Sequence, residues 1–593
     1  MKPHAALSSA AAPGKPFLSL LRYNRPYWNE YAGGAALSLL HAALGAVMPL
    51  VVRGVVGAFE SGAITYGRLG GLVGGLVGVF VIAGVGRYFQ RTLMINASRK
   101  FEYDLRNDYY RRVLTLSRAF FNRTSTGDIM ARATNDINFV RDFIGPGVMY
   151  TIDMLRVPVS LGMMIYLSAK LTLIAMIPLP FLSVAVYFLV RYMQRQSRVV
   201  QEQFSAITAR VQENLAGARV VKAHGIADRE VARFREEAEK YMRDNLRLVA
   251  VTSFAWPLIG ILLGGAILLI IWRGGGFVLE GSLRLADLTA FLVCVIMLAL
   301  PLAQFGWVLT LYQRGAVGMN RISEVLAATP DIRDEAGVRR DARIARGAIR
   351  FENVSFAYDG AAVLDNVSVD VAPGATVAIV GPTGSGKSTM VALITREYDP
   401  TAGRIRIDGT DLREIPLAVL REAIGCVPQD TFIFSDSIRH NLLLGRPDAT
   451  EDEMRQACEI AQFAADVAEM PRGYDTLLGE RGINLSGGQK QRLALARAIL
   501  CKPCILVLDD ALSSVDTQTE ERILHGLRAV MATRTSIIIS HRISAVRDAD
   551  LIVVLEDGQV AETGDHAALV ARAGLYAAMY RRQLLEKALE EEA

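Results

Sequence analysis

The sequence predicts an α-helical membrane domain of six transmembrane helices, followed in the same chain by an α/β nucleotide-binding domain. Of the 593 residues, 51% are hydrophobic and the mean hydropathy is +0.27, which is too apolar for an ordinary soluble enzyme. The apolar excess lies before about residue 315. A glycine-rich phosphate-binding loop at residues 381–389 marks the second domain.

Six apolar stretches approach or exceed the roughly 20 residues that cross a bilayer as a helix. They are residues 31–56, 69–92, 146–168, 171–192, 250–272 and 285–311. Any one of them is compatible with a buried helix of a soluble protein. Six in the first half of the chain predict a multi-pass membrane domain in contact with the lipid bilayer.

The links between these stretches predict their orientation. Three links are short and hold few basic residues, whereas residues 93–145 and 193–249 are long and rich in arginine and lysine. Basic segments stay on the cytoplasmic side. We therefore expect the long segments, both termini and the nucleotide-binding domain in the cytoplasm, with the spans in the cell's inner (plasma) membrane.

The two long segments show helical periodicity and almost no proline, so the membrane helices are expected to extend beyond the bilayer. Turn-like breaks at residues 125–128 and around Gly217 and Gly225 predict short crossing helices at the far tips.

The chain is expected to divide into five parts. They are a disordered N-terminus at 1–15, a membrane domain at 16–325 that begins with an amphipathic elbow helix, a linker at 326–345, a nucleotide-binding domain at 346–585 and an acidic tail at 586–593. A net charge of +5 is accounted for by the cytoplasmic segments, so the composition predicts no nucleic-acid partner.

The phosphate-binding loop has the sequence context that its chemistry requires. It lies between an apolar run at 375–380 and a helical pattern at 390–398. Glycines allow close backbone approach to a phosphate, and the N–H groups at the helix start supply donors. The loop residues are Gly381, Pro382, Thr383, Gly384, Ser385, Gly386, Lys387, Ser388 and Thr389. Lys387 would neutralise phosphate charge and Ser388 would ligate Mg²⁺.

A carboxylate that would bind the metal and a second phosphate-binding helix start follow later in the sequence. Asp509 ends the apolar run 505–509, where a buried strand would place its carboxylate at the metal. Ser486, Gly487, Gly488 and Gln489 precede a run of good helix formers, so they predict another helix start that binds phosphate. Two such helix starts in one domain indicate that they serve different ATP molecules.

Residues 340–585 therefore resemble the nucleotide-binding domain of ABC transporters. In that family, ATP is sandwiched between the phosphate-binding loop of one domain and the Ser-Gly-Gly-Gln signature of another. The resemblance implies that Tyr358 stacks on adenine, that Gln429 contacts Mg²⁺ and the attacking water, and that His541 contacts the γ-phosphate. It also implies that Asp516, at the end of the Ser-Ser-Val-Asp loop, lies where two such domains meet.

With the six spans ahead of this domain, nearly the whole chain resembles an ABC exporter half-transporter. The resemblance implies a dimer that uses ATP and Mg²⁺ to export or flip a hydrophobic or amphipathic substrate, such as a drug-like molecule, a peptide or a lipid. The crossing helices would dock on the ATPases and transmit motion.

Position 510 departs from the family pattern. Hydrolytically competent members usually have Glu after the metal-binding Asp, as the base for the attacking water, whereas this chain has Asp510. One methylene fewer retracts the carboxylate by roughly 1.5 Å, and a general base must come within about 3 Å of its proton. Asp510 is therefore expected to be a poor base.

This departure leaves three interpretations. An Asp-Asp pair with an intact signature resembles the weak half of a heterodimeric exporter, whose partner keeps Glu. A homodimer that uses Asp510 and His541 is the second interpretation. The third is a nucleotide-gated channel or regulatory subunit on the same fold, which would dissipate a gradient instead of building one.

Two charged residues in the third predicted span also have more than one interpretation. Asp153 and Arg156 are three residues apart and so share a helical face. Lone charges in a membrane are costly, so they form either a structural pair or part of a cavity lining.

Overall fold

The computed structural model describes residues 20–21, 23–62, 65–335 and 337–592. The chain forms two compact units, one of residues 1–113 with 127–327 and one of residues 114–126 with 328–593. We call them the membrane unit and the ATPase unit. The expected disordered N-terminus at 1–15, and residues 16–19 and 22 of the expected elbow helix, lie outside the described residues.

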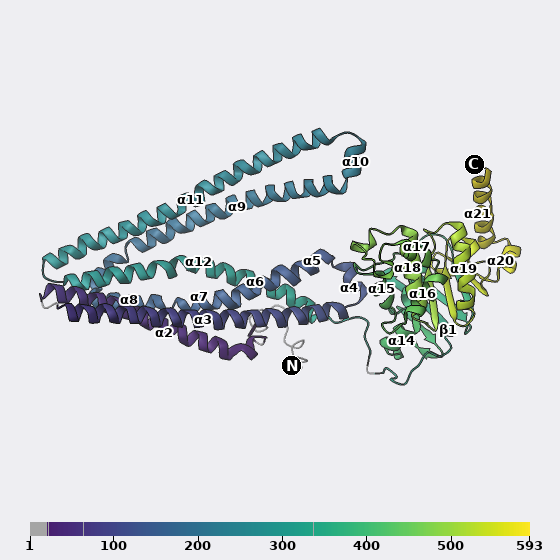
Figure 1. The fold of residues 1–593 in the computed structure, drawn as a ribbon, viewed down its shortest axis with the longest axis horizontal. Helices are drawn as coiled ribbons and strands as arrows, with labels where there is room; N and C mark the ends of the chain where they lie inside the picture. The colour runs from purple at the N-terminus through teal and green to yellow at the C-terminus, as the bar shows by residue number, and fades with distance from the viewer. Residues whose placement is uncertain (1–19, 22, 63–64, 336, 593) are drawn as a thin grey trace. The chain divides into compact units, whose positions relative to one another are not determined.

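The membrane unit is helical throughout its described part (Figure 1). Its elements are η2 (Arg25–Tyr27), α2 (Trp28–Glu60), α3 (Tyr66–Thr115), α5 (Thr126–Ala131), η3 (Arg132–Asp136), α6 (Ile137–Asp142), η4 (Phe143–Gly147), α7 (Val148–Asp153), α8 (Arg156–Ala175), α9 (Pro178–Ala216), α10 (Ala218–Ala223), α11 (Ala227–Leu279) and α12 (Leu285–Ala327).

Four helical runs among the described residues are long and apolar enough to cross a membrane. They are Arg25–Glu60, Tyr66–Thr115, Thr126–Ala175 and Gly260–Leu279. These runs confirm the first, second, third and fifth predicted spans. The fourth and sixth predicted spans, within α9 and α12, include side chains that lie outside the described part.

The structure breaks the helix at Ser168, next to the link at 169–170 that the sequence predicted between the third and fourth spans. Helix α8 runs to Ala175, but Ser168 has non-helical backbone angles, φ −165° and ψ 105°, so α8 consists of two helical segments that meet at a kink there. The chain leaves the helix at Met176 and Ile177, and α9 begins at Pro178. Ile177 keeps helical backbone angles, φ −63° and ψ −48°, although it precedes a proline, and Pro178 fits the first turn of α9.

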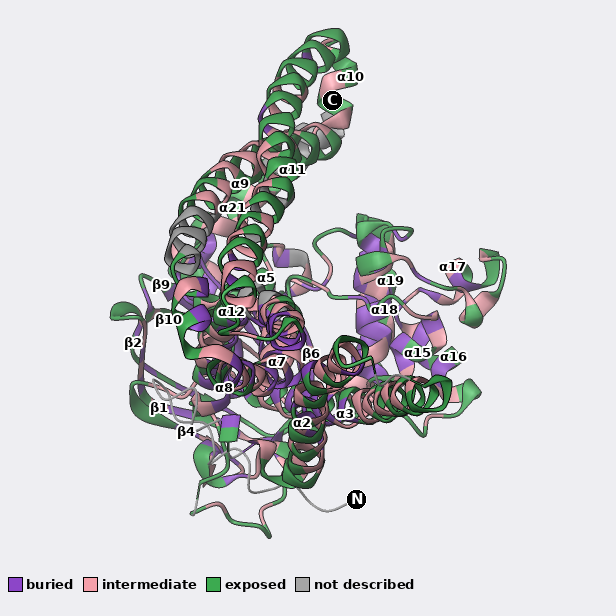
Figure 2. Cartoon of the chain, turned by 90° about the vertical axis from the view of Figure 1, so that its left-hand side faces the viewer, coloured by how far each residue is buried: buried purple, intermediate pink, exposed green. Residues whose placement is uncertain are grey.

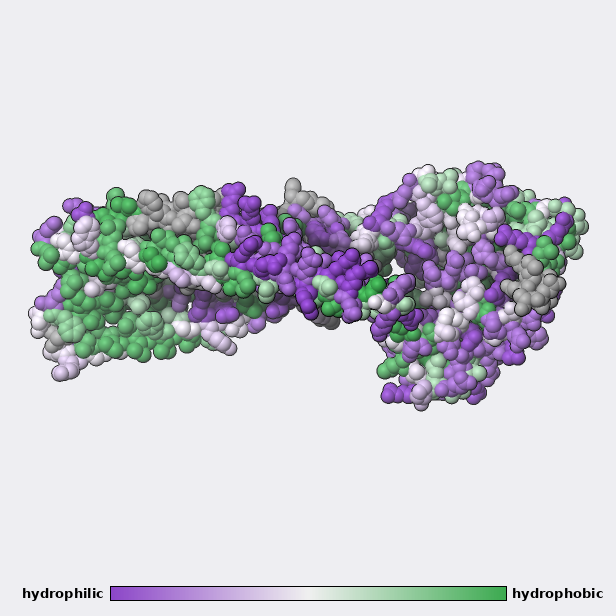
Figure 3. All heavy atoms as spheres, turned by 90° about the horizontal axis from the view of Figure 1, so that it is seen from above, coloured by the Kyte–Doolittle hydropathy of each residue, from purple (hydrophilic) through white to green (hydrophobic). Residues whose placement is uncertain are grey.

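The helices do extend far beyond their apolar parts. Helices α9 and α11 form a long hairpin closed by α10, with the chain turning at Gly217 and at Gly225, whose φ is 60° (Figure 1). The hairpin is largely exposed in Figure 2. In Figure 3, hydrophobic side chains gather at one end of the membrane unit and hydrophilic ones cover the other.

The ATPase unit contains two sheets. A four-stranded antiparallel sheet has the order β2-β1-β4-β5, and a six-stranded sheet has the order β10-β9-β3-β8-β7-β6. The strands are β1 (Ile349–Tyr358), β2 (Ala361–Val371), β3 (Thr376–Val380), β4 (Ala402–Ile407), β5 (Thr410–Asp411), β6 (Ile424–Val427), β7 (Ile505–Asp509), β8 (Thr535–Ile539), β9 (Leu551–Glu556) and β10 (Gln559–Gly564).

Strands β3, β6, β7, β8 and β9 run parallel, so their carboxyl ends share one edge of the six-stranded sheet. Strand β7 is buried at every position, as expected for a parallel strand covered on both faces. The helices are α4 (Arg118–Arg123), α13 (Lys387–Ile394), α14 (Leu417–Ala423), α15 (Ile438–Leu443), α16 (Glu451–Ile460), α17 (Ala464–Glu469), α18 (Gly487–Leu500), α19 (Thr517–Met531), α20 (His566–Arg572) and α21 (Leu575–Glu592), with short turns η5 (Leu412–Glu414), η6 (Gly473–Asp475), η7 (Glu480–Gly482) and η8 (Ile543–Ala545).

Candidate nucleotide-binding site

The phosphate-binding loop connects β3 to α13 and depends on its glycines. Gly381 has φ 153°, and a Cβ there would lie 2.2 Å from the carbonyl oxygen of Leu555. Gly386 precedes α13 with φ 98°, and its Cβ would lie 2.6 Å from Leu364. Only glycine fits such positions without displacing neighbours. The loop is thus held in a shape that leaves the first N–H groups of α13 without intrahelical acceptors.

Lys387 lies inside this loop. Its Nζ donates hydrogen bonds to the carbonyl oxygens of Gly381 at 2.9 Å and Pro382 at 2.7 Å. Burial lowers the pKa of the Lys387 ammonium, and the negative charges of Asp509 and Asp510 oppose that shift. The ammonium is therefore held by weak acceptors at a place where a phosphate would be a stronger partner.

Two oxygen ligands meet beside the lysine. Ser388 Oγ donates to Asp509 Oδ1 over 3.2 Å, and Asp509 is 6% exposed. Burial raises the pKa of the Asp509 carboxyl, although Ser388 and Lys387 act in the opposite direction. Hydroxyl and carboxylate oxygens are the hard ligands that Mg²⁺ prefers, so this pair fits that cation.

Asp510 follows in a left-handed backbone conformation, with φ 50°. Its N–H donates to the carbonyl oxygen of Ile539 over 2.9 Å, which ties the end of β7 to the end of β8. A non-glycine residue in this conformation is uncommon and is stabilised here by that hydrogen bond.

One cavity of about 250 Å³ collects most of the predicted site residues. It is lined by Val363, Thr383, Gly384, Gly386, Lys387, Ser388, Thr389, Gln429, Asp509, Asp510, Ile539 and His541. Residues from five separate segments thus meet at the carboxyl edge of the parallel sheet. Val363 and Ile539 were not predicted, because isolated apolar residues in strands carry no sequence signal for a site.

The signature residues lie apart from this cavity. Ser486 and Gln489 form a capping box at the start of α18, in which Ser486 Oγ accepts from the Gln489 N–H at 3.2 Å and Gln489 Oε1 accepts from the Ser486 N–H at 2.9 Å. Gln489 Nε2 also donates to Asp466 of α17 over 2.8 Å. Gly487, Gly488 and Asp516 are likewise absent from the cavity lining. Asp516 begins α19 and accepts from the Thr519 N–H at 2.9 Å. A role opposite a second ATPase stays a prediction for all of them.

Tyr358 lies in an aromatic cluster outside the cavity lining. Its ring meets those of Phe356 at 4.7 Å and Tyr398 at 5.2 Å, both edge to face. The stacking of Tyr358 on adenine also stays a prediction.

Helix α4 docks on this aromatic cluster within the ATPase unit. Asn122 donates to the hydroxyl of Tyr398 over 2.8 Å. Arg118 pairs with Glu397, and Arg123 pairs with Asp359, the residue after Tyr358. The sequence placed a crossing helix near residue 125, but its contact with Tyr398 could not be read from local pattern.

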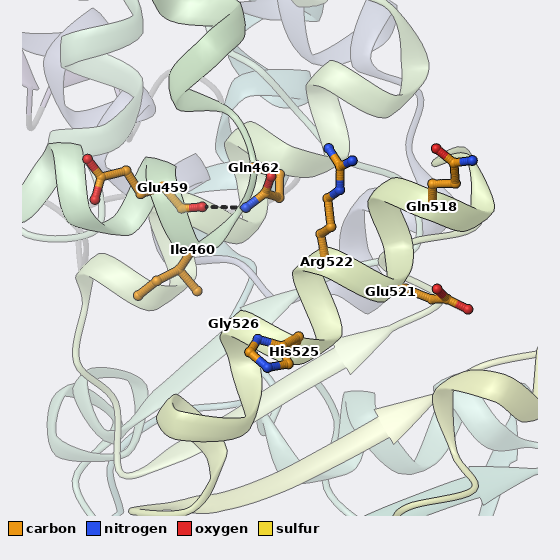
Figure 4. A pocket seen from close by; sticks show the side chains of 8 residues that line it. All are labelled: Glu459, Ile460, Gln462, Gln518, Glu521, Arg522, His525 and Gly526. Atoms are coloured by element: carbon orange, nitrogen blue, oxygen red, sulfur yellow. Dashed lines mark hydrogen bonds between the residues drawn. The ribbon is translucent and has the colours of Figure 1, made fainter.

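A larger hollow of about 780 Å³ lies between α16 and α19 and holds none of the predicted residues. It is lined by Glu459, Ile460, Gln462, Gln518, Glu521, Arg522, His525 and Gly526 (Figure 4). The Gln462 side chain donates to the Glu459 carbonyl oxygen over 3.1 Å, across one side of the hollow. Its lining has no glycine-rich loop that would hold the phosphates of a nucleotide.

In the membrane unit, Asp153 pairs mainly with a residue that was not predicted. Arg87 Nη1 lies 2.5 Å from Asp153 Oδ2, whereas Arg156 Nη2 is 3.9 Å from Oδ1. Gln90, fully buried, donates to Asp153 Oδ1 over 3.3 Å. The charges therefore form a network between α3 and α7 and not only the expected i, i+3 pair.

Comparisons with known proteins identify the family to which both parts of the chain belong. The family model for the ABC transporter transmembrane region matches residues 33–302, and the ABC transporter model matches residues 364–513. The chain is 37% identical to the multidrug resistance-like ATP-binding protein MdlA of Escherichia coli K12 over 579 residues, covering 97% of this chain and 98% of that protein. It is 36% identical to an ATP-dependent lipid A-core flippase of Syntrophus aciditrophicus, covering 87% and 86%.

The fold also matches a solved structure. A bacterial Atm1-family ABC exporter with ATP bound superimposes with a TM-score of 0.75 at 29% identity, covering 95% of this chain and 98% of that one. These similarities cover the membrane unit, the ATPase unit and their order in the chain. The protein therefore belongs to the ABC transporters, as an ATP-hydrolysing half-transporter of the exporter type.

Proposed function

We propose that this chain, as half of a dimer, exports or flips an amphipathic, drug-like or lipid-like substrate across the cell's inner membrane at the expense of ATP. The names of its relatives support this substrate class, since they include a multidrug resistance-like protein and a lipid A-core flippase. The basic segments support a cytoplasmic position for both termini and for the ATPase unit.

Different cavity residues bind different parts of Mg-ATP. Lys387 and the N–H groups at the start of α13 bind phosphate oxygens, and Ser388, Asp509 and Gln429 hold Mg²⁺. Bound Mg-ATP supplies the phosphoryl group whose transfer to water drives the cycle. Tyr358 holds the adenine, and Ser486–Gln489 of one half complete the ATP site of the other half.

The aspartate at position 510 is the feature on which we base the contribution of this half-transporter to ATP hydrolysis. It lines the cavity beside Gln429 and His541, and its backbone is fixed by the hydrogen bond to Ile539. A short carboxylate on a fixed backbone cannot move forward to replace the missing methylene. The own site of this chain therefore hydrolyses ATP slowly, and the intact signature serves the better site of a different partner half-transporter.

Two alternatives follow from the same residues. A homodimer would use Asp510, through an additional water, together with His541. A nucleotide-gated channel or regulatory subunit would bind Mg-ATP without pumping, and uphill movement of substrate in sealed vesicles would distinguish it from an exporter. Heterodimeric export accounts for both the Asp at 510 and the intact signature.

The first experiment is the Mg-ATPase rate of the purified chain in lipid nanodiscs, beside Asp510→Glu. The matched control is Asp557→Glu, which adds the same methylene at another left-handed aspartate, in the exposed turn between β9 and β10. Near-zero rates in all three proteins support a missing partner. Robust wild-type turnover would overturn the heterodimer in favour of a self-sufficient homodimer. A rise of about 100-fold in Asp510→Glu alone would mean that carboxylate reach limits a competent homodimer.

A further inference from the structure

The C-terminal helix contacts the loop that carries His541. Nε2 of Gln583, on α21, donates a hydrogen bond to the carbonyl oxygen of His541. Oε1 of the same side chain accepts from the N–H of Ile543 over 2.8 Å. One side-chain amide thus satisfies the two backbone groups on either side of Arg542.

The position of Gln583 on α21 is unusual for a polar residue. Tyr576 is fully buried, and Met579 and Tyr580 pack against the same core. Gln583 follows Tyr576 by seven residues, which is two helical turns, so it lies on the same inward face. A core-facing stripe normally continues with an apolar residue. Here it ends in an amide whose donor and acceptor both reach the loop.

Helix α21 is anchored where it begins. Its Leu575 N–H donates to Glu562 Oε1 of β10 over 2.6 Å. His566 Nδ1 and the Tyr576 hydroxyl share a hydrogen bond of 2.8 Å. Gln583 is therefore presented from a helix fixed to the sheet, which is what precise positioning of a second group requires.

The other side of the loop is held as well. The Arg542 guanidinium pairs with Glu520, which is 2% exposed, and donates to the carbonyl oxygen of Val515 over 3.2 Å. The loop backbone is thus fixed on both sides of the peptide that follows His541. The His541 side chain is left to line the cavity with Lys387 and Asp510.

We propose that Gln583 is a positioning residue for His541, through which the C-terminal helix sets the geometry of the nucleotide site. The inference rests on the proposed contact of His541 with the γ-phosphate. Its consequence is that any displacement of α21, far along the chain from the phosphate-binding loop, slows ATP turnover without removing a group that contacts nucleotide.

The test compares Gln583→Leu, His541→Ala and the double variant in full-length protein in nanodiscs, with Arg581→Ala on α21 as the control. Each is made in the wild-type and Asp510→Glu backgrounds, and hydrogen exchange of the Ile543 amide gives a readout that does not require ATP turnover. Turnover gives kcat and KM for Mg-ATP, and hydrogen exchange reports the Ile543 amide. We expect Gln583→Leu to lower kcat about tenfold with little change in KM, and to speed exchange of that amide. The double variant should be no slower than His541→Ala, because both changes act through one side chain.

Several results would overturn the inference. Wild-type turnover in Gln583→Leu beside an impaired His541→Ala would remove the positioning role and leave the proposed function intact. A double variant much slower than His541→Ala would mean that Gln583 acts elsewhere. Wild-type protein that binds no Mg-ATP would overturn the proposed function and the inference together. If Gln583→Leu does not fold, Gln583→Glu replaces it, since it keeps the acceptor for Ile543 and puts a charged carboxylate oxygen where the amide donated to His541.

Discussion

Ser388 Oγ donates to Asp509 Oδ1 over 3.2 Å and so joins the start of α13 to the end of β7. Strand β8 lies between β3 and β7 in the sheet, so the contact bridges over one strand. It is possible because the parallel strands end at a common edge. The arrangement also leaves a carboxylate buried near Asp510, with the buried Lys387 as its counter-charge.

The buried carboxylate predicts a gain in stability for Asp509→Asn in protein free of nucleotide. Burial raises the folded pKa of Asp509 above its ordinary value, so between those two values the folded state binds more protons than the unfolded state. The contribution of wild-type Asp509 to stability therefore falls as pH rises through that window, and the full cost is present at neutral pH.

We expect Asp509→Asn to raise Tm by about 2 to 4 °C at pH 7, and the difference to shrink as pH is lowered toward about 4. Mg-ATP should then stabilise the wild type more than the variant. Thermal unfolding with and without Mg-ATP measures both effects, with Asp557→Asn as the exposed control. A lower Tm for Asp509→Asn at pH 7 without nucleotide would contradict the burial cost.

The phosphate-binding loop predicts unequal costs for two glycine substitutions. Gly381 and Gly384 both have positive φ, so alanine at either position is strained by roughly 1 to 2 kcal/mol. At Gly384 an added Cβ meets no described atom within 4 Å, whereas at Gly381 it meets the backbone oxygen of Leu555 at 2.2 Å. Gly381→Ala should therefore destabilise the ATPase unit by at least about 2 kcal/mol more than Gly384→Ala, as urea unfolding followed by fluorescence would measure. Equal costs would mean that the loop relaxes away from Leu555.

The contacts of α4 predict a variant whose fold is stable but whose ATPase activity responds poorly to transported substrate. The ion pairs of Arg118 and Arg123 are largely exposed, and such pairs contribute at most about 1 kcal/mol each. Replacing both arginines by alanine should change Tm by less than about 3 °C. ATPase activity stimulated by substrate should fall severalfold while basal activity remains. The reason is that α4 would lose its ion pairs with Glu397 and with Asp359, the residue after Tyr358. Arg350→Ala, which breaks an exposed ion pair with Asp370 in the same unit, is the matched control and should not affect stimulation.

The sequence predicted those parts of the molecule that local pattern defines. The phosphate-binding loop, the end of β7 and the breaks near Gly217 and Gly225 each depend on neighbouring residues, and the structure has them in place. The link predicted at 169–170 lies beside the kink at Ser168, and the apolar residues that follow it continue as helix to Ala175. Gln583 and Arg87 were missed, since each acts on residues 40 or more positions away in the chain.

The network around Asp153 predicts that its two arginine neighbours are not equivalent. Arg87 Nη1 lies 2.5 Å from the carboxylate and donates to Gln90 Oε1 over 3.1 Å, whereas Arg156 Nη2 is 3.9 Å away. Removing one partner of a buried pair leaves the other charge uncompensated. Arg87→Gln should therefore destabilise the membrane unit by about 2 kcal/mol, and Arg156→Gln by less than about 1 kcal/mol.

Thermal unfolding of the full chain in nanodiscs would rank these variants, with exposed Arg91→Gln, one turn further along α3, as the control. Asp153→Asn should be nearly as damaging as Arg87→Gln, and the double variant should recover most of the loss, because a neutral pair leaves no charge buried alone. Additive losses would mean that Asp153 is balanced by Arg156 after all. In that case the i, i+3 pair read from the sequence, and not the pairing across α3 and α7, would hold these helices together.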